Sequence, residues 1–172
     1  MANTASLSIS ATMLPDDISK TISNLTAAYT PASDEGWYYR LTDISTSSAD
    51  LISNANFIQL GSTKAQGGLA TAGSATALDG TQDNIKFLFV RHMGTTDDGS
   101  SATSESIYLG IGVTAAHGTA ACIEIPSGQS WWGKFNTLIT NDLHCISGDA
   151  GGTGAGSGTI QAQVFAIIGD NS

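Results

Sequence analysis

Hydrophobic and polar residues alternate along several stretches of the chain. In Ser6–Met13 the even positions are Ser or Thr and the odd positions are apolar, and Ile107–Val113 and Ile160–Ile168 follow the same period of two. This period places successive side chains on opposite faces of a β-strand. Each of the three stretches is therefore predicted to be a strand with one buried face.

Other runs complete an all-β pattern. Ile85–Val90 is apolar on both faces in part, as a central strand would be. Shorter predicted strands, separated by Gly, Ser, Asp or Asn turns, are Trp37–Leu41, Asn56–Leu60, Ala121–Ile125, Trp131–Leu138 and Leu143–Ser147. About nine or ten short strands with such turns are typical of a sandwich or barrel. We expect a two-sheet antiparallel sandwich, jelly-roll-like, with long Gly/Ser/Ala-rich loops and with the N- and C-terminal strands in the sheets.

Some segments do not alternate. Within Leu14–Tyr29, apolar residues recur at spacings of three and four, as on a helix face, but the intervening Thr and Ser residues are poor helix formers. Pro15-Asp16-Asp17 fits a turn equally well. A short helix and a turn both remain open for this segment. The predicted loops are Gly61–Gly80, Gly94–Ser104 and Gly148–Gly158.

Length and composition fit one domain. The chain has 172 residues, and domains commonly contain about 100–200 residues. Ser, Thr, Gly and Ala make up nearly half of the chain, whereas charged residues account for only 12%. Small residues and Thr suit short strands and turns better than long helices. No repeat and no interior linker divides the sequence, so we expect residues 1–172 to form a single β-sandwich domain.

The acidic net charge of the chain limits the classes of partner that it is expected to bind. Six basic residues stand against fifteen acidic ones, which gives a net charge of −9. Nucleic acid binding depends on Lys and Arg neutralising phosphates, and the six basic residues here form no run. No stretch approaches the roughly 20 apolar residues that span a bilayer. We therefore expect neither nucleic acid nor membrane as a partner, and attraction only to neutral or basic surfaces.

The residues that could carry chemistry form no recognised catalytic motif. The glycine run Gly151–Gly158 contains no Lys, so it is not a phosphate-binding loop. The three histidines, His92, His117 and His144, lack the short spacing of a zinc site. The pairs Asp16-Asp17 and Asp97-Asp98 fit turns better than calcium loops. We expect no enzymatic activity, no catalytic residues, no cofactor and no metal.

The two cysteines, Cys122 and Cys145, lie in apolar runs that read as strands. Cysteine is among the residue types most often buried as a thiol. Two buried thiols are therefore the favoured interpretation, and a disulfide is the alternative.

The aromatic residues point to binding. Trp37 begins the run Trp37-Tyr38-Tyr39, and Trp131 and Trp132 are adjacent. On a strand, one member of an adjacent pair faces inward and its neighbour faces outward. An outward Trp on a polar surface can anchor a protein interface, and it could also stack on a sugar ring. Burial of both strand faces within one subunit is the alternative that needs no partner. We expect Trp37, Trp131 and Trp132 to lie at an interface.

Three parts of the sequence resemble structural proteins of tailed-bacteriophage particles, particularly those of marine and cyanobacterial phages. The first comprises LPDDISKTI and the run Trp37–Thr46, and the second is Ile85–Gly99 leading into Ser106–Val113. The third runs from Ala115 to Gly169 and includes a Pro-x-Gly-x-x-Trp turn at Pro126–Trp131. The likeness covers most of the chain, but its motifs are those of turns and strands.

The resemblance implies a component of the virion. It implies first a decoration (cement) protein on the surface of the phage head, which stabilises the capsid through protein–protein contacts. The implied partners are the major capsid protein or another virion protein, and further copies of the chain, often as a homotrimer. The alternative is a carbohydrate-binding or receptor-binding component of the tail or its fibres. A place on the head, neck or tail is not fixed by the likeness.

Overall fold

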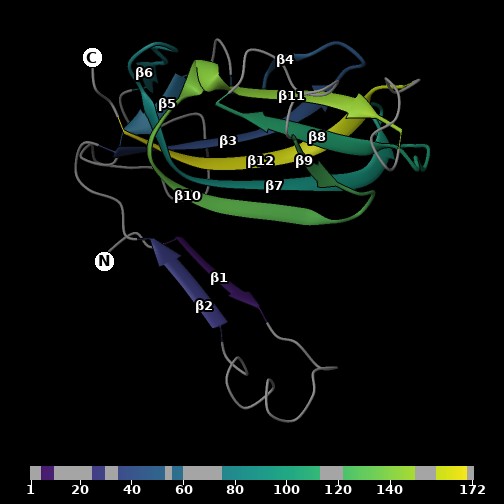
Figure 1. Cartoon of the computed structure of the whole chain (residues 1–172), viewed down its shortest axis with the longest axis horizontal. Coiled ribbons are helices and arrows are strands. Elements are labelled where there is room, and N and C mark those ends of the chain that lie inside the picture. Colours follow the sequence, from purple (N-terminus) through teal and green to yellow (C-terminus); the bar gives the residue numbers. More distant parts are fainter. Residues whose placement is uncertain are drawn as a thin grey trace. The chain divides into compact units, whose positions relative to one another are not determined.

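The computed structural model describes residues 5–9, 25–29, 35–52, 56–59, 75–112, 122–149 and 158–169. The chain divides into two compact units, Met1–Ala32 and Ser33–Ser172, which are described separately (Figure 1). The expectation of one domain over residues 1–172 stays a prediction. In the described part of the chain, no helix is long and apolar enough to cross a membrane.

The first unit contains a pair of antiparallel strands, β1 (Ala5–Ile9) and β2 (Leu25–Tyr29). Ala5 pairs with Tyr29, and Ile9 pairs with Leu25. The strand predicted from Ser6–Met13 is confirmed over β1, and its remainder lies outside the described residues. The helix considered for Leu14–Tyr29 is wrong over β2, because Leu25 and Tyr29 share a helical spacing but also share a strand parity.

The second unit is built of two antiparallel sheets. The larger sheet has the strand order β10-β7-β12-β3-β5-β6, and the smaller has the order β4-β11-β8-β9. The strand bounds are β3 Glu35–Ile44, β4 Ala49–Asp50, β5 Asn56–Gln59, β6 Ala75–Ala77, β7 Asn84–Thr96, β8 Ser106–Ile111, β9 Cys122–Ile125, β10 Ser130–Ile139, β11 Leu143–Gly148 and β12 Ile160–Gly169. A short 3-10 turn, η1 (Thr140–Asp142), joins β10 to β11.

Eight of these strands form a jelly roll. Leaving β5 and β6 aside, the strands pair first with last and so on inward: β3 with β12, β4 with β11, β7 with β10, and β8 with β9. The pairings of β12 with β7 and of β11 with β8 then close the two four-stranded layers. This nested order is that of a double Greek key, and it confirms the predicted fold class.

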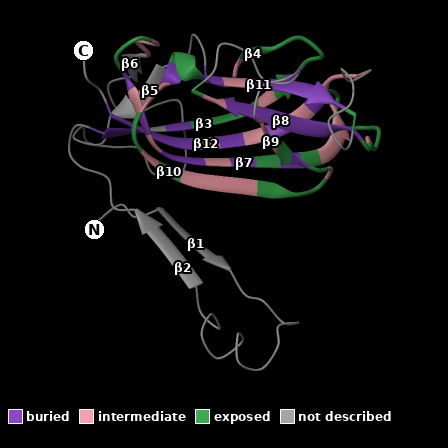
Figure 2. Ribbon diagram, in the orientation of Figure 1, coloured by how far each residue is buried: buried purple, intermediate pink, exposed green. Residues whose placement is uncertain are grey.

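The alternation in β12 explains its central place. Ile160, Ala162, Val164, Ala166 and Ile168 are fully buried and belong to the core between the sheets. The core also receives side chains from β3, β7, β8, β9 and β11. Figure 2 shows the resulting contrast between the buried β12 and the more exposed β10. Both edges of β12 are also paired, because it hydrogen-bonds to β7 on one side and to β3 on the other.

Two predicted loops contain more strand than expected. Ala75–Ala77, within the predicted loop Gly61–Gly80, forms β6 against β5, and the earlier residues of that loop lie outside the described part. Strand β7 continues past Gly94 to Thr96, and Thr95 forms a bridge with Ala102. Gly148–Gly158 lies mostly outside the described residues.

The turn between β9 and β10 follows its sequence closely. The Gln129 amide donates to the Pro126 carbonyl oxygen at 3.0 Å, and Gly128 has a φ of 74°. A turn whose third residue has a positive φ needs glycine at that position. The Pro-x-Gly sequence therefore sets where β10 begins, and so the face on which each of its side chains lies.

Candidate functional site: the outer face of the larger sheet

The larger sheet has one face toward the core and one face away from it. On β12 the core side chains are the even-numbered ones, so Gln161, Gln163 and Phe165 lie on the outer face. The same parity places Tyr39 and Leu41 of β3 on that face, because Tyr38 and Ile44 belong to the core. The outer face can therefore be read from the register.

An aromatic row crosses four strands in register. Tyr39 of β3 pairs with Phe165 of β12, Phe165 pairs with Phe89 of β7, and Phe89 pairs with Trp132 of β10. Directly opposed residues on one face lie about 5 Å apart, close enough for their rings to touch. The four side chains thus form one continuous line across the sheet.

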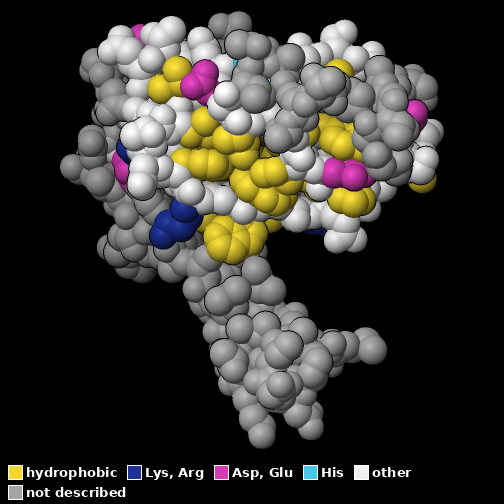
Figure 3. Space-filling model, in the orientation of Figure 1, with side chains coloured by type: hydrophobic (Ala, Val, Ile, Leu, Met, Phe, Trp, Pro, Cys, Tyr) yellow, Lys and Arg dark blue, Asp and Glu magenta, His cyan; other side chains and the backbone are white. Residues whose placement is uncertain are grey.

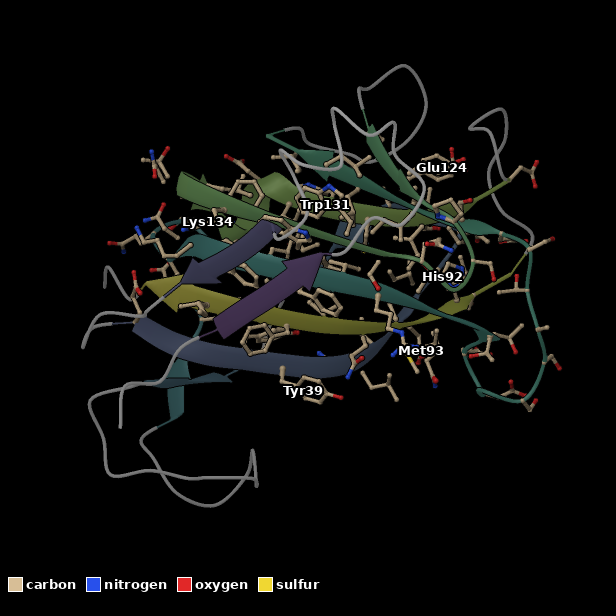
Figure 4. All side chains as sticks on the ribbon, turned by 90° about the horizontal axis from the view of Figure 1, so that it is seen from below. Tyr39, His92, Met93, Glu124, Trp131 and Lys134 are labelled. Carbon is tan, nitrogen blue, oxygen red and sulfur yellow. The ribbon has the colours of Figure 1, made fainter. Side chains whose placement is uncertain are left out.

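Two flanking rows extend this surface, which we call the aromatic face. Its twelve positions, in rows from β3 to β10, are Leu41, Gln163, Arg91 and Ser130; Tyr39, Phe165, Phe89 and Trp132; and Trp37, Ile167, Phe87 and Lys134. Six of the twelve residues are aromatic. Figure 4 shows this sheet from below, with Tyr39 on β3 and Lys134 on β10, the two outer strands of the aromatic face.

Contacts between neighbouring side chains hold the face in place. The Phe87 ring lies 6.3 Å from the Trp132 ring in a stacked arrangement, and 6.3 Å from the Phe165 ring in an edge-to-face arrangement. Both geometries are favourable for aromatic pairs. The Gln163 amide donates to the Tyr39 hydroxyl at 2.8 Å. The rings are therefore fixed before any partner binds.

Exposure is concentrated toward one end of this face. The exposed large hydrophobic side chains in the described part of the chain are Leu41 at 50%, Tyr39 at 40% and Met93 at 36%. All three point away from the core. Leu41 and Tyr39 belong to the outer face, and Met93 does too because the preceding residue, His92, is buried on the inner side. Phe87 and Ile167, in the third row, are buried at 3% and 0%. The accessible apolar surface thus lies over the first two rows and Met93.

The charges of the aromatic face are unlike those of the whole chain. Its two charged residues, Arg91 and Lys134, are basic and exposed, and none of the twelve positions is Asp or Glu. The nearest acidic position along β3 is Asp43, two residues beyond Leu41. The chain overall carries fifteen acidic and six basic residues. The expectation of attraction to neutral or basic surfaces therefore does not describe this face.

The three predicted interface residues have different surroundings. Trp132 lies on the aromatic face, while Trp131 packs against the core and its ring lies 6.2 Å from that of Phe135. Trp37 pairs with Ile167 in the third row, and its side chain lies outside the described residues. The structure thus places Trp132 on the aromatic face and Trp131 on the other side of the sheet, and Trp37 is located only by its backbone pairing. Their role at an interface stays a prediction.

Trp131 belongs to a second apolar group, at the margin of the core. Figure 3 shows hydrophobic side chains gathered across the middle of the second unit, between β10 and β11. The partly buried hydrophobic residues that pack against the core are Leu78, Ile111, Ile123, Trp131, Phe135 and Leu138. These side chains complete the sandwich, so we do not count them as part of the site.

Most of the aromatic face was missed by the sequence analysis, although the signal was present. In the alternating stretch Ile160–Ile168, Phe165 and Ile167 occupy positions where a solvent-facing strand would carry polar residues. Ile85–Val90 is apolar on both sides for the same reason, since Phe87 and Phe89 face outward. Apolar residues at strand positions that are expected to face solvent thus indicated a second apolar surface, either buried or used for binding.

The described histidines considered for chemistry lie apart from each other. His144 Nε2 lies 3.0 Å from Asp50 Oδ1 across β11 and β4, and His92 is buried elsewhere, beside β8. His117 and the pair Asp16-Asp17 lie outside the described residues. Among the described residues no group of three or more His, Cys, Asp or Glu side chains could hold a metal ion.

The remaining acidic pair builds a turn. The Ser100 hydroxyl and the Thr96 hydroxyl donate to the two carboxylate oxygens of Asp98 at 2.5 and 2.7 Å. These hydrogen bonds, from Ser100 first, lower the pKa of the exposed Asp98 to about 2. The arrangement satisfies the carboxylate locally, as expected for a turn-forming Asp.

The cysteines are both thiols, on opposite sides of the smaller sheet. Cys145 is buried in the core, and half-buried Cys122 packs with Tyr108 and Ile146 on the outer side. Burial, together with the charge of Asp50, raises the pKa of the Cys145 thiol to about 12. Because the thiolate is the reactive form, Cys145 is not a nucleophile at neutral pH.

Comparison with known proteins adds one structure. No protein-family model matches the sequence, and no curated protein matches it. Among solved structures, the Tobacco streak virus coat protein dimer is similar with a TM-score of 0.37 and 7% sequence identity, covering 84% of this chain and 91% of that one. At that TM-score the similarity has no bearing on the function of the chain.

Proposed function

We propose that the chain is a non-enzymatic structural protein of a virus particle, and in particular a decoration (cement) protein on the head of a tailed bacteriophage. It stabilises the capsid by protein–protein contacts with the major capsid protein or another virion protein. The observation that carries the proposal is the aromatic row from Tyr39 to Trp132, held in register on the outer face of a jelly-roll sheet.

Three features support a docking role over a catalytic one. The face lies across four neighbouring strands of one sheet, and it is rich in aromatic residues, which anchor protein interfaces. Its rings are already fixed by mutual contacts, so little conformational entropy is lost on docking. Jelly rolls also form capsid domains in many viruses, although lectins and cupins share the architecture. The resemblance in sequence to phage structural proteins is what points to the phage head.

The test is co-sedimentation of the purified chain with undecorated capsids of its phage. Trp132→Ala removes a ring from the aromatic face and is expected to weaken capsid binding about 10-fold or more, because interface tryptophans contribute on the order of 2 kcal/mol. Thr137→Ala, at an exposed position of the same strand, is the matched control and should bind normally. Normal capsid binding by Trp132→Ala would contradict the proposal.

Trp131→Ala separates packing from docking. Since Trp131 packs against the core, its removal is expected to lower stability and to weaken capsid assembly indirectly. The molar mass of the free protein, measured by light scattering after size exclusion, tests the further expectation of a homotrimer. A trimer would support a decoration protein placed around a symmetry axis, and a monomer would contradict that part of the proposal.

A second candidate function is binding of carbohydrate by a tail or fibre component. The arrangement that favours it is exposed Tyr39 beside the hydrogen-bonded Gln163 amide, since aromatic rings stack on sugars and amides bond their hydroxyl groups. Saturable glycan binding that is lost in Tyr39→Ala, without capsid binding, would establish this function in place of the first.

A further inference from the structure

Arg91 gives the aromatic face a charge opposite to that of the molecule. The chain has a net charge of −9, yet Arg91 lies in the first row of the face, two residues from Phe89 on β7. It is exposed and pairs in register with Gln163 and Ser130, which are both uncharged. Within the described residues Arg91 has no ion-pair partner. Its guanidinium is therefore available to a partner that covers this face.

The lack of carboxylates disfavours stacking of two copies through the aromatic face. In such a pair Arg91 would be desolvated against positions that carry no carboxylate, because none of the twelve is acidic and Asp43 lies one row outside them. Leaving a buried charge uncompensated costs several kcal/mol. Two molecules of net charge −9 also repel each other. A homotrimer would therefore have to use other surfaces.

The size of the face limits what one contact can do. Strands are about 4.8 Å apart and same-face residues about 6.8 Å apart along a strand, so the two accessible rows across four strands span about 14 Å by 7 Å between outer Cα atoms. With side chains at the rim this is roughly 250 Å², about a third of the 800 Å² that each partner buries in a standard interface. The face therefore fits a short segment or one corner of a partner.

We propose that the aromatic face docks a segment of a different protein that combines apolar side chains with a carboxylate paired to Arg91. Arginine binds carboxylates in a bidentate manner, which adds orientation as well as energy. The apolar side chains of the segment cover Tyr39, Leu41 and Phe89, and its Asp or Glu reaches Arg91 in the row beside the aromatic one. This inference rests on the proposed function, since it specifies the chemistry of the protein that the face docks.

The experiment selects partners without assuming their identity. The full chain is immobilised and panned against a random twelve-residue peptide library, and the recovered peptides are synthesised and titrated by calorimetry. We expect peptides that join Asp or Glu to aromatic or aliphatic residues and that lose binding with Trp132→Ala. Arg91→Gln should weaken these peptides about 10-fold, the usual scale of one charge-assisted contact.

A double-mutant cycle tests whether the carboxylate of the peptide pairs with Arg91. Replacing the acidic residue of the peptide by its amide should cost as much as Arg91→Gln, and the two changes together should cost little more than either one. Arg40→Gln is the control, because it removes the same charge from β3 at a position with the core parity. It should leave peptide binding unchanged.

The remaining outcomes decide against the inference. Peptides that need Trp132 but bind Arg91→Gln as well as the natural chain would overturn the acidic partner and leave protein docking intact. If no recovered peptide depends on Trp132, the inference is overturned. The proposed function would then be tested by the capsid-binding experiment alone. Self-association through Tyr39 and Trp132, or glycan binding there, would overturn it in favour of those occupants.

Discussion

His92 is fixed in one protonation state by two backbone groups. The Gly94 amide donates to its Nδ1 at 2.9 Å, so Nε2 carries the proton and donates to the Glu105 carbonyl oxygen, also at 2.9 Å. The side chain is fully buried. A proton on Nδ1 would point at the Gly94 N–H, and the charge would have no water around it. Burial accordingly lowers the pKa of His92 below its ordinary value of 6.5.

The stability of the protein should therefore fall in mild acid. The unfolded chain takes up a proton on His92 near pH 6.5, whereas the folded chain does so only at lower pH. The contribution of His92 is complete above pH 6.5 and is lost as pH falls through and below that value. We predict a lower free energy of unfolding at pH 5.5 than at pH 7.5, measured by urea denaturation.

A variant isolates this residue from the other titrating groups. His92→Phe leaves the Gly94 amide and the Glu105 carbonyl without their partner, and it should lower stability at pH 7.5 by about 2–4 kcal/mol. Its loss of stability between pH 7.5 and 5.5 should be smaller than that of the natural chain. An equal loss in both proteins would show that other groups cause the acid sensitivity.

At the scale of the element, β10 depends on a glycine between two rings. A Cβ built on Gly133 would lie 2.6 Å from Cη2 of Trp131 and 3.3 Å from Cζ of Phe135. Trp131 and Phe135 flank Gly133 on the same strand face, and their rings cover it where they pack against the core. Aromatic side chains over a strand glycine are a known way to compensate for its missing side chain.

Gly133→Ala should consequently destabilise the protein, although alanine ordinarily suits a strand better than glycine does. The added methyl group forces the Trp131 ring off its position, at a cost of about 1–3 kcal/mol. In a Trp131→Ala background the clash is absent, and the same change should be neutral or stabilising. Thermal unfolding of the four proteins measures this. A similar cost in both backgrounds would place the strain in the backbone instead.

The elements show which parts of the fold the sequence could predict. The stretches that became β1, β8 and β12 have a regular period of two over enough residues to be recognised. Strand β4 is too short for any pattern, since its two residues are placed by pairing with His144 and Cys145 of β11. Strand β2 was obscured because Leu25 and Tyr29 suit a helix face and a strand face alike.

The candidate site was harder to predict because it depends on register. Adjacent tryptophans indicated that one side chain of β10 would face outward, and Trp132 does. Nothing in the sequence specified that Phe89, Phe165 and Tyr39 would stand in line with it, since those residues are brought together by strands far apart in the chain. The side chain of Gln163, for example, reaches the Tyr39 hydroxyl across 124 residues of sequence.

At the scale of the whole molecule, the nested pairing places the first and last strands of the jelly roll side by side in one sheet. Its first and last strands, β3 and β12, pair along their length from Glu35–Gly169 to Ile44–Ile160. Strand β12 lies between β7 and β3 and contributes five residues to the core. The core residues that the structure describes all lie between 38 and 168, within the second unit.

This arrangement predicts opposite outcomes for removing the two ends of the chain. Deleting residues 159–172 takes away a central strand with its five core side chains and leaves the facing edges of β3 and β7 unpaired, so cooperative unfolding should be lost. Deleting residues 1–32 leaves every described core residue in place, so the second unit should still unfold in one thermal transition followed by circular dichroism. Loss of that transition in the second deletion would contradict the prediction, because the second unit would then not fold by itself.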